Sequence, residues 1–246
     1  NLMHFFVGAN NEHLYPAVDA FCGTIDEVEI FNHVLSDDEV KELTNRAVAL
    51  RLRFDEPPGV TAFNDSGAMQ AAAACSPPNC PTAGLPGRDH QSAGFNVSPG
   101  HTGDTLVLPT SSINGFTDRL TVAAWVRLSA LSPYYQYIAS TATNMTLDGW
   151  GFLAFKSELC FNMLGRDIYC SSGANLQAGR WYHVAAVLDG GATKSLQFYL
   201  DGQPLGAAIT GISPSYGDTM DRFLIGSATS RSTGEITDFW HGLIDN

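Results

Sequence analysis

The sequence predicts an all-β protein, an antiparallel β-sandwich with one short helix. Short alternating or apolar runs follow one another from residue 50 onward, and Gly, Pro, Asn and Asp separate them, as is typical of strands and turns. Many short strands with almost no helix indicate two packed antiparallel sheets. The predicted strands cover residues 50–54, 104–108, 120–128, 137–140, 151–156, 159–163, 181–188, 196–200 and 223–225.

The one helix is predicted over residues 36–44. Ser36 is a typical N-cap, and Glu39 stands three residues later, as in a capping box. Val40 and Leu43 supply a short apolar stripe.

Composition favours an exported globular protein. The chain has 246 residues, 44% of them hydrophobic, and a formal net charge of −12. This charge disfavours binding to nucleic acid or to anionic membranes, because both would repel it. No apolar run approaches the ~20 residues that span a bilayer, so we expect no membrane insertion. Without an initiator Met, signal peptide or anchor motif, the sequence is expected to be an internal piece of a longer exported protein.

Four of the five cysteines form two local pairs. Cys160 and Cys170 flank an apolar–turn–apolar segment and would face each other across a hairpin. Cys75 and Cys80 bracket a short Ser-Pro-Pro-Asn loop. Two disulfides would indicate an oxidising, extracellular location, whereas the alternative is two pairs of reduced thiols. Cys22 is left over and is expected to be a free thiol.

An internal repeat divides the chain. Residues 5–8 (FFVG) match residues 223–226 (FLIG), and residues 21–26 (FCGTID) match residues 240–245 (WHGLID), at offsets of 218 and 219. We therefore expect residues 1–48 to be the closing strands and helix of a preceding module. Residues 49–246 would be the next module, lacking its last strand.

The missing strand leads to a prediction about residues 27–32. An unfilled position would leave backbone groups unpaired beside residues 50–55. We expect residues 27–32 to fill it, either within the chain or by donation from a neighbouring copy of the same module.

Four motifs that are known from one protein family occur in the chain. They are residues 50–55 (LRLRFD) with 64–67 (NDSG), residues 120–126 (LTVAAWV), residues 179–185 (GRWYHVA) with 196–202 (LQFYLDG), and residues 23–31 (GTIDEVEIF) with 35–39 (LSDDE). Together they resemble the laminin G-like/concanavalin A-like superfamily, in its bacterial jelly-roll variety. The resemblance implies a jelly-roll sandwich in which Trp125 and Trp181 point into the core, and we expect His183 to be structural.

The resemblance also implies a calcium ion at the rim of the sandwich. Its expected ligands are Asp65 and either Asp26 or Asp245, with Asn64 as a further ligand, since calcium prefers carboxylate and carbonyl oxygens. The alternative is that Asp65 is an Asx-turn residue that caps the following Ser-Gly.

Aromatic residues in turn-rich segments are the candidates for ligand binding. Tyr134 and Tyr135, Trp150 and Tyr216 all neighbour Gly, Pro or Ser, where a ring could stack on a sugar. The expected partner is a glycan or an extracellular protein. Isolated surface aromatics are also ordinary, so each residue alone could be without function.

Some members of the superfamily are glucanases, which use two carboxyl groups. The best pair is Glu27 and Glu29, but the second copy of this motif has Asn246 in place of Glu27. We therefore expect no enzymatic activity. The predicted function is adhesion or carbohydrate/protein binding in a tandem-repeat surface protein. The alternatives are a purely structural repeat of a fibre or stalk, or a degenerate jelly-roll glycoside hydrolase.

Overall fold

The computed structural model describes Val34 and residues 48–98, 102–109, 119–142, 149–163, 167–191, 194–212, 222–230 and 232–246. Residues 47–246 form one compact unit. The helix expected over residues 36–44 and the strand expected over residues 27–32 lie outside the described residues.

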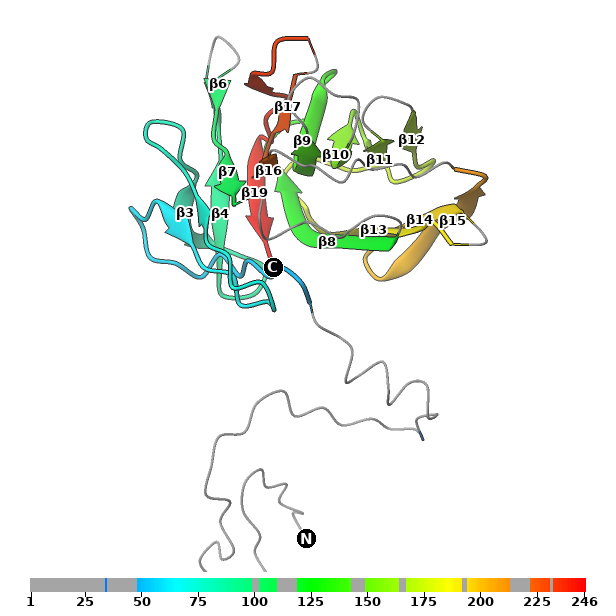
Figure 1. The fold of residues 1–246 in the computed structure, drawn as a ribbon, viewed down its shortest axis with the longest axis horizontal. Helices are drawn as coiled ribbons and strands as arrows, with labels where there is room; N and C mark the ends of the chain where they lie inside the picture. The colour runs from blue at the N-terminus through cyan, green and yellow to red at the C-terminus, as the bar shows by residue number, and fades with distance from the viewer. Residues whose placement is uncertain are drawn as a thin grey trace, which may run out of the picture. The chain divides into compact units, whose positions relative to one another are not determined.

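Two antiparallel sheets make up most of this unit, and the predicted all-β sandwich is confirmed (Figure 1). The order of the eight-stranded sheet is β1 (Ala62–Phe63), β2 (Ala73–Ala74), β7 (Leu106–Leu108), β16 (Arg222–Ile225), β9 (Tyr135–Ala142), β10 (Trp150–Phe155), β11 (Glu158–Met163) and β12 (Ile168–Cys170). The order of the seven-stranded sheet is β15 (Gln203–Thr210), β14 (Ser195–Leu200), β13 (Trp181–Asp189), β8 (Arg119–Leu128), β19 (Gly242–Asp245), β4 (Gln91–Phe95) and β3 (Thr82–Pro86). Two short pairs complete the structure: β17 (Ala228–Thr229) with β18 (Ile236–Thr237), and β5 (Val97–Ser98) with β6 (Thr102–Gly103).

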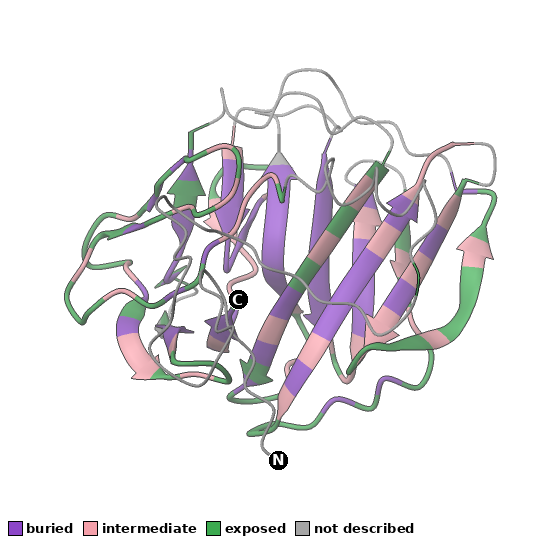
Figure 2. Ribbon diagram, turned by 90° about the horizontal axis from the view of Figure 1, so that it is seen from below, coloured by how far each residue is buried: buried purple, intermediate pink, exposed green. Residues whose placement is uncertain are grey.

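Strand alternation decides which side chains reach the core. Along β8, Ala124, Val126 and Leu128 are buried, while Trp125 and Arg127 point to the opposite face. Figure 2 shows this alternation as bands of buried and more exposed residues along the strands of the seven-stranded sheet. The inner faces of the two sheets enclose one core, whose largest fully buried side chains include Trp150, Trp240, Phe63, Phe95, Phe152 and Phe161.

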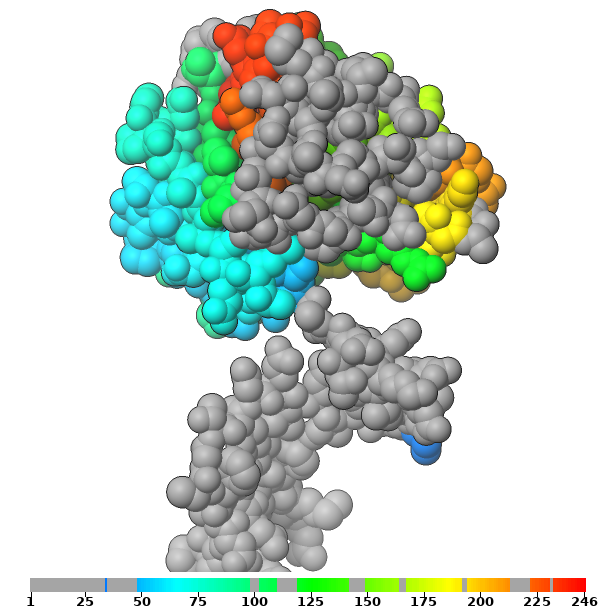
Figure 3. All heavy atoms as spheres, in the orientation of Figure 1, coloured from blue at the N-terminus to red at the C-terminus, as the bar shows by residue number. Residues whose placement is uncertain are grey.

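The sequence predicts no strand between residues 54 and 104, but the structure has several there, and the longest are β3 and β4. β3 and β4 pair with each other, and β4 pairs with β19, so this hairpin extends the seven-stranded sheet. The sequence of β4 does not show the alternation of a strand, because one of its positions is Gly94. Leu85 packs so closely there that a side chain would not fit. In Figure 3 the blue-to-cyan part of the chain accordingly forms a broad region of the surface of the compact unit.

At residues 50–54 the sequence predicts a strand that the structure does not form. Only Leu52 pairs there, in a single bridge with Asp65. Phe54 has φ 58°, which interrupts an extended strand even though its side chain is buried against Phe63.

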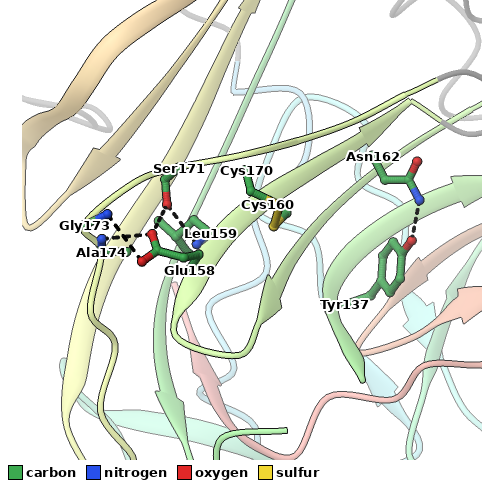
Figure 4. The surroundings of a disulfide bond; sticks show 9 residues. All are labelled: Tyr137, Glu158, Leu159, Cys160, Asn162, Cys170, Ser171, Gly173 and Ala174. Atoms are coloured by element: carbon green, nitrogen blue, oxygen red, sulfur yellow. Dashed lines mark hydrogen bonds between the residues drawn. A yellow bond between two sulfur atoms is a disulfide. The ribbon is translucent and has the colours of Figure 1, made fainter. Parts of the chain in front are cut away.

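Both predicted disulfides are formed, Cys75–Cys80 and Cys160–Cys170. The second joins β11 to β12, where the two cysteines are directly paired (Figure 4). Beside it, the Glu158 carboxylate accepts hydrogen bonds from the Ser171 hydroxyl at 2.8 Å and the Ala174 amide at 3.0 Å. These contacts fix the segment through which the chain leaves the eight-stranded sheet for β13.

Candidate ligand-binding site

One row of paired residues crosses the outer face of the seven-stranded sheet. Asp245 of β19 pairs with Trp125 of β8, and Trp125 pairs with His183 of β13. Asp201, directly after β14, continues the row: its amide donates to the His183 carbonyl at 2.8 Å. Directly paired residues point to the same side of a sheet, so these four polar or aromatic side chains gather on one face.

Trp125 and Trp181 therefore point away from the core, which corrects the expectation that both are inward. The inward neighbours are Val126 and Tyr182, which are 1% and 4% exposed. Trp125 and Trp181 are half-buried on the outer face. Trp125 contacts His183 edge-on, with ring centroids 5.3 Å apart.

A buried carboxylate holds the loop on one side of these rings. Asp245 is 1% exposed, and its Oδ2 accepts hydrogen bonds from the amides of Arg88 at 2.7 Å and Asp89 at 3.0 Å. Its Oδ1 accepts one from the Asn246 amide at 2.7 Å. Gly87 makes this approach possible, because a Cβ there would lie 2.5 Å from Oδ2 of Asp245. The β3–β4 loop is thus tied down over the sheet.

Arg88, in that loop, lies over the indole of Trp125. Its guanidinium carbon is 4.9 Å from the ring centroid, within the range of a cation–π contact. The Arg88 residue is exposed, so its donor groups remain accessible.

The turn at Asp201 and Gly202 bounds the other side. Asp201 (φ 49°) and Gly202 (φ 77°) form the tight connection from β14 to β15. Oδ1 of Asp201 accepts the His183 amide at 3.0 Å, and Oδ2 lies 3.8 Å from a guanidinium nitrogen of Arg180. The carboxylate is therefore oriented and partly neutralised by its neighbours.

Between the two walls is an open pocket of about 490 Å³, a size typical of small-ligand sites. The pocket is bordered by two indoles, an imidazole, a guanidinium and a carboxylate. The indoles can stack on a flat apolar face of a ligand, and the other groups can exchange hydrogen bonds with its edge. Its lining residues are Arg88, Trp125, Trp181, His183, Asp201 and Gly202.

The predicted calcium ligands are engaged in backbone contacts. Oδ1 of Asp65 accepts the amides of Arg51 at 2.7 Å and Gly67 at 2.6 Å, and Oδ2 accepts the Ala71 amide at 3.1 Å. The Gly67 contact is the hydrogen bond of an Asx-turn, the alternative considered for this residue.

The donor set around these carboxylates fits a calcium ion poorly. N–H groups already point at both Asp65 and Asp245, where a cation would need free oxygen lone pairs. Asn64 is exposed, and Asp26 lies outside the described residues. Among the residues that the structure describes, no three His, Cys, Asp or Glu side chains gather as a metal-binding group. The calcium ion stays a prediction.

The aromatic residues predicted to bind ligand do not line the pocket. Tyr134 is 67% exposed beside the eight-stranded sheet, and Tyr135 packs on Phe155 with ring centroids 4.9 Å apart. Trp150 is 2% exposed and stacks on Phe161 in the core, so its expected role as an accessible loop aromatic is wrong. Tyr216 lies outside the described residues.

The pocket was not predicted from the sequence, although the alternation of apolar residues along β8 indicates which way Trp125 points. The apolar residues Leu120, Val122, Ala124, Val126 and Leu128 occupy every second position, which turns Trp125 outward. Arg88 had no such signal, because its place depends on a contact with Asp245, far away in the sequence.

Several solved structures are similar to this chain. Trypanosoma rangeli sialidase in complex with sialic acid aligns with TM-score 0.52 and 16% identity, over 79% of this chain and 29% of the sialidase. Domains LG4-5 of the mouse laminin alpha1 chain align with TM-score 0.48 and 21% identity, over 70% of this chain and 43% of the laminin chain. A native heptameric SAP-like pentraxin from Limulus polyphemus aligns with TM-score 0.44 and 16% identity, over 70% of either chain.

A comparison with curated proteins finds no match. A family model described as the concanavalin A-like lectin/glucanases superfamily matches residues 100–246. That range is more than half of the chain and contains β8, β13, β14 and β19, the strands that carry most of the pocket. With the two-sheet antiparallel architecture, this match shows that the chain belongs to the concanavalin A-like lectin/glucanase superfamily.

Proposed function

We propose that this chain is a non-catalytic extracellular module that binds a carbohydrate in the pocket between Arg88 and Asp201. The observation that carries the proposal is the gathering of Trp125, Trp181 and His183 between these two charged side chains on an open sheet face. A fold that needed the two tryptophans only for stability would direct them into the core, where burial of an indole contributes most.

Sugar recognition needs the two kinds of surface that this pocket combines. The C–H groups on one face of a pyranose ring pack on an indole, and its hydroxyls exchange hydrogen bonds around the rim. Trp181 has no cation over its ring among the described contacts, so we assign the stacking role to it. Arg88 donates from one side, and Asp201 accepts from the other.

The absence of hydrolysis is part of the proposal. Glycoside hydrolysis in this superfamily uses two carboxyl groups on either side of the scissile bond. Among the described residues that line the pocket, Asp201 is the one carboxylate. Asp245, the nearest other acid of the row, is buried and does not line the pocket, and its two oxygens accept three amide hydrogen bonds that hold the β3–β4 loop. Glu27 and Glu29 lie outside the described residues.

The extracellular location rests on the disulfides. Cys75–Cys80 and Cys160–Cys170 are formed, and such bonds persist in oxidising compartments. Within the described ranges, the chain contains no helix that could span a bilayer.

A glycan array probed with the full chain tests the proposal. We expect binding to a defined group of glycans and its loss, by about tenfold or more in affinity, in Trp181→Ala, since burial of a large apolar side chain contributes about 1.5–3 kcal/mol. The variant Tyr134→Ala tests the alternative that the sequence predicts, in which the ligand binds at Tyr134 beside the eight-stranded sheet. Binding that survives Trp181→Ala and disappears in Tyr134→Ala would move the site to the eight-stranded sheet.

The alternatives make different predictions. A purely structural repeat would bind no glycan but would assemble with neighbouring copies, which light scattering over a concentration series detects. A hydrolase would cleave laminarin, lichenan, xylan or agarose oligosaccharides, which chromatography of the incubated sugars detects. We expect intact sugars after incubation.

A further inference from the structure

We propose that the ligand of this pocket is an anionic carbohydrate, one whose carboxylate or sulfate group is bound by Arg88. This inference rests on the proposed function and names the class of sugar. It begins with the position of a single guanidinium in a strongly acidic protein, whose net charge is −12.

Both the backbone and the side chain of Arg88 are held in place. Its backbone amide donates to the buried Asp245 carboxylate at 2.7 Å, and its guanidinium lies 4.9 Å from the centre of the Trp125 ring. A side chain that is already ordered loses less conformational entropy when it binds a ligand. The flat guanidinium is thus presented at the pocket before any ligand arrives.

Within the described part of the chain, no carboxylate forms an ion pair with Arg88. The adjacent Asp89 contacts His90 at 3.1 Å, and Asp201 across the pocket has Arg180 as its cationic neighbour. A second arginine stands on the same face: Arg127, two residues after Trp125 on β8, uses its Nε for the Gly179 carbonyl at 3.0 Å and is exposed. Arg88 therefore borders the pocket without a paired carboxylate, and Arg127 adds a second positive charge to the same face of the sheet.

The two walls differ in charge. Asp201 is partly neutralised by Arg180, whereas Arg88 has no such compensation, so the positive end of the pocket lies at the β3–β4 loop. An arginine fork matches the two oxygens of a carboxylate or sulfate, and such charge-assisted pairs are about twice as strong as neutral ones. The ligand's anionic group would lie at Arg88, and its hydroxyls would face His183 and Asp201.

Uronic acids and sialic acids carry this chemistry as a carboxylate, and sulfated sugars carry it as a sulfate ester. The test uses oligogalacturonate of six residues, its carboxyl-reduced neutral counterpart, and sulfated and desulfated galactan oligosaccharides of matched length. Titration calorimetry with the full 246-residue chain measures each affinity. We expect at least one acidic sugar to bind ten times more tightly than its neutral counterpart and to weaken as salt rises.

Arg88→Gln should lower the affinity for that acidic sugar by about tenfold or more and remove the preference over the neutral form. The matched control is Arg119→Gln, which removes an arginine at the other end of β8 that pairs with Asp189 at 3.2 Å. This variant should bind as the unmodified chain does.

The outcomes separate this inference from the function on which it rests. Binding of neutral sugars that equals or exceeds binding of their acidic forms contradicts the inference and leaves carbohydrate binding intact. An acidic preference that Arg88→Gln does not change contradicts the role of Arg88. If neither these sugars nor any glycan on the array binds, the proposed function fails, and the inference fails with it.

Discussion

The Asp245 carboxylate accepts a 2.7 Å hydrogen bond from the Arg88 amide, although the two residues are 157 positions apart in the sequence. The carboxylate belongs to β19, an interior strand of the seven-stranded sheet, and the arginine belongs to the loop of the hairpin at its edge. This contact places the guanidinium over Trp125 and so forms one wall of the pocket.

Asp245→Asn should therefore weaken both folding and binding. Asparagine keeps one acceptor oxygen but turns an amide donor toward a backbone N–H. Hydrogen bonds to a charged group contribute about 1.5–3 kcal/mol, so we expect the free energy of unfolding to fall by about 2 kcal/mol in denaturant titrations. Affinity for the pocket ligand should fall because Arg88 loses its fixed position.

Two controls separate these effects. Asp65→Asn alters a carboxylate that also accepts three amide hydrogen bonds, but outside the pocket. It should lower stability and leave affinity unchanged. In a double-mutant cycle, Asp245→Asn should cost no further affinity once Arg88 is replaced by Ala. Additive losses would contradict the view that Asp245 acts through Arg88.

Calcium binding by Asp65 and a closing-strand Asp would raise the melting temperature in calcium above that in excess chelator, but the amide hydrogen bonds at these carboxylates lead us to expect equal temperatures. An ion that binds only the folded state stabilises it by about 2.7 kcal/mol at one hundred times its dissociation constant. Differential scanning calorimetry measures both temperatures. A higher melting temperature in calcium, abolished by Asp65→Asn, would contradict this expectation and establish the calcium site.

Burial raises the pKa of the Asp104 carboxyl, even though hydrogen bonds from the amide and side chain of Asn96 act to lower it. The folded state therefore binds this proton more tightly than the unfolded state does. The corresponding stability is present below the ordinary pKa of 3.8 and is lost as the pH rises through the higher folded value.

Asp104→Asn should remove this penalty, because asparagine is neutral and can still accept from the Asn96 amide. We expect the melting temperature at pH 7 to rise by about 1–3 °C and the gain to vanish near pH 3. Asp89→Asn, an exposed control, should change the melting temperature at neither pH. A gain of equal size at both pH values would assign the effect to packing instead of charge.

The two disulfides should differ in their contribution to stability. Cross-linking the unfolded chain contributes more for a longer loop, and the sequence separations are 10 for Cys160–Cys170 and 5 for Cys75–Cys80. Replacing Cys160 and Cys170 together by Ala should lower the free energy of unfolding by about 2–3 kcal/mol. The corresponding Cys75 and Cys80 variant should lose less, and the reverse order would contradict this account.

The fold was predictable because its main strands have strong local patterns. Residues 120–128 and 181–188 alternate clearly, and the structure has strands over Arg119–Leu128 and Trp181–Asp189. The cysteine spacings identified both disulfides. β3 (TAGLP) and β4 (QSAGF) escaped prediction because small and polar residues outnumber large apolar ones in both, and because β4 pairs with β19, more than 140 residues away.

The candidate site was much less predictable. The motif around Trp125 drew attention to the correct strand, but family resemblance placed the ring inward, against the alternation of its apolar neighbours. Trp150 was predicted to be an accessible loop residue because Asp and Gly precede it, whereas in the structure it begins a buried strand. Contacts such as Arg88 with Trp125 follow from tertiary structure and have no local sequence signal.

The most direct test of carbohydrate binding at the outer-face pocket is nuclear magnetic resonance of the tryptophan indole N–H groups. The chain has four tryptophans, of which Trp150 and Trp240 are 2% and 0% exposed and serve as internal references. During titration with the highest-affinity sugar from the array, we predict that the Trp125 and Trp181 resonances shift in a saturable manner, while those of Trp150 and Trp240 stay in place. Saturable binding that leaves the Trp125 and Trp181 resonances unmoved would contradict the account.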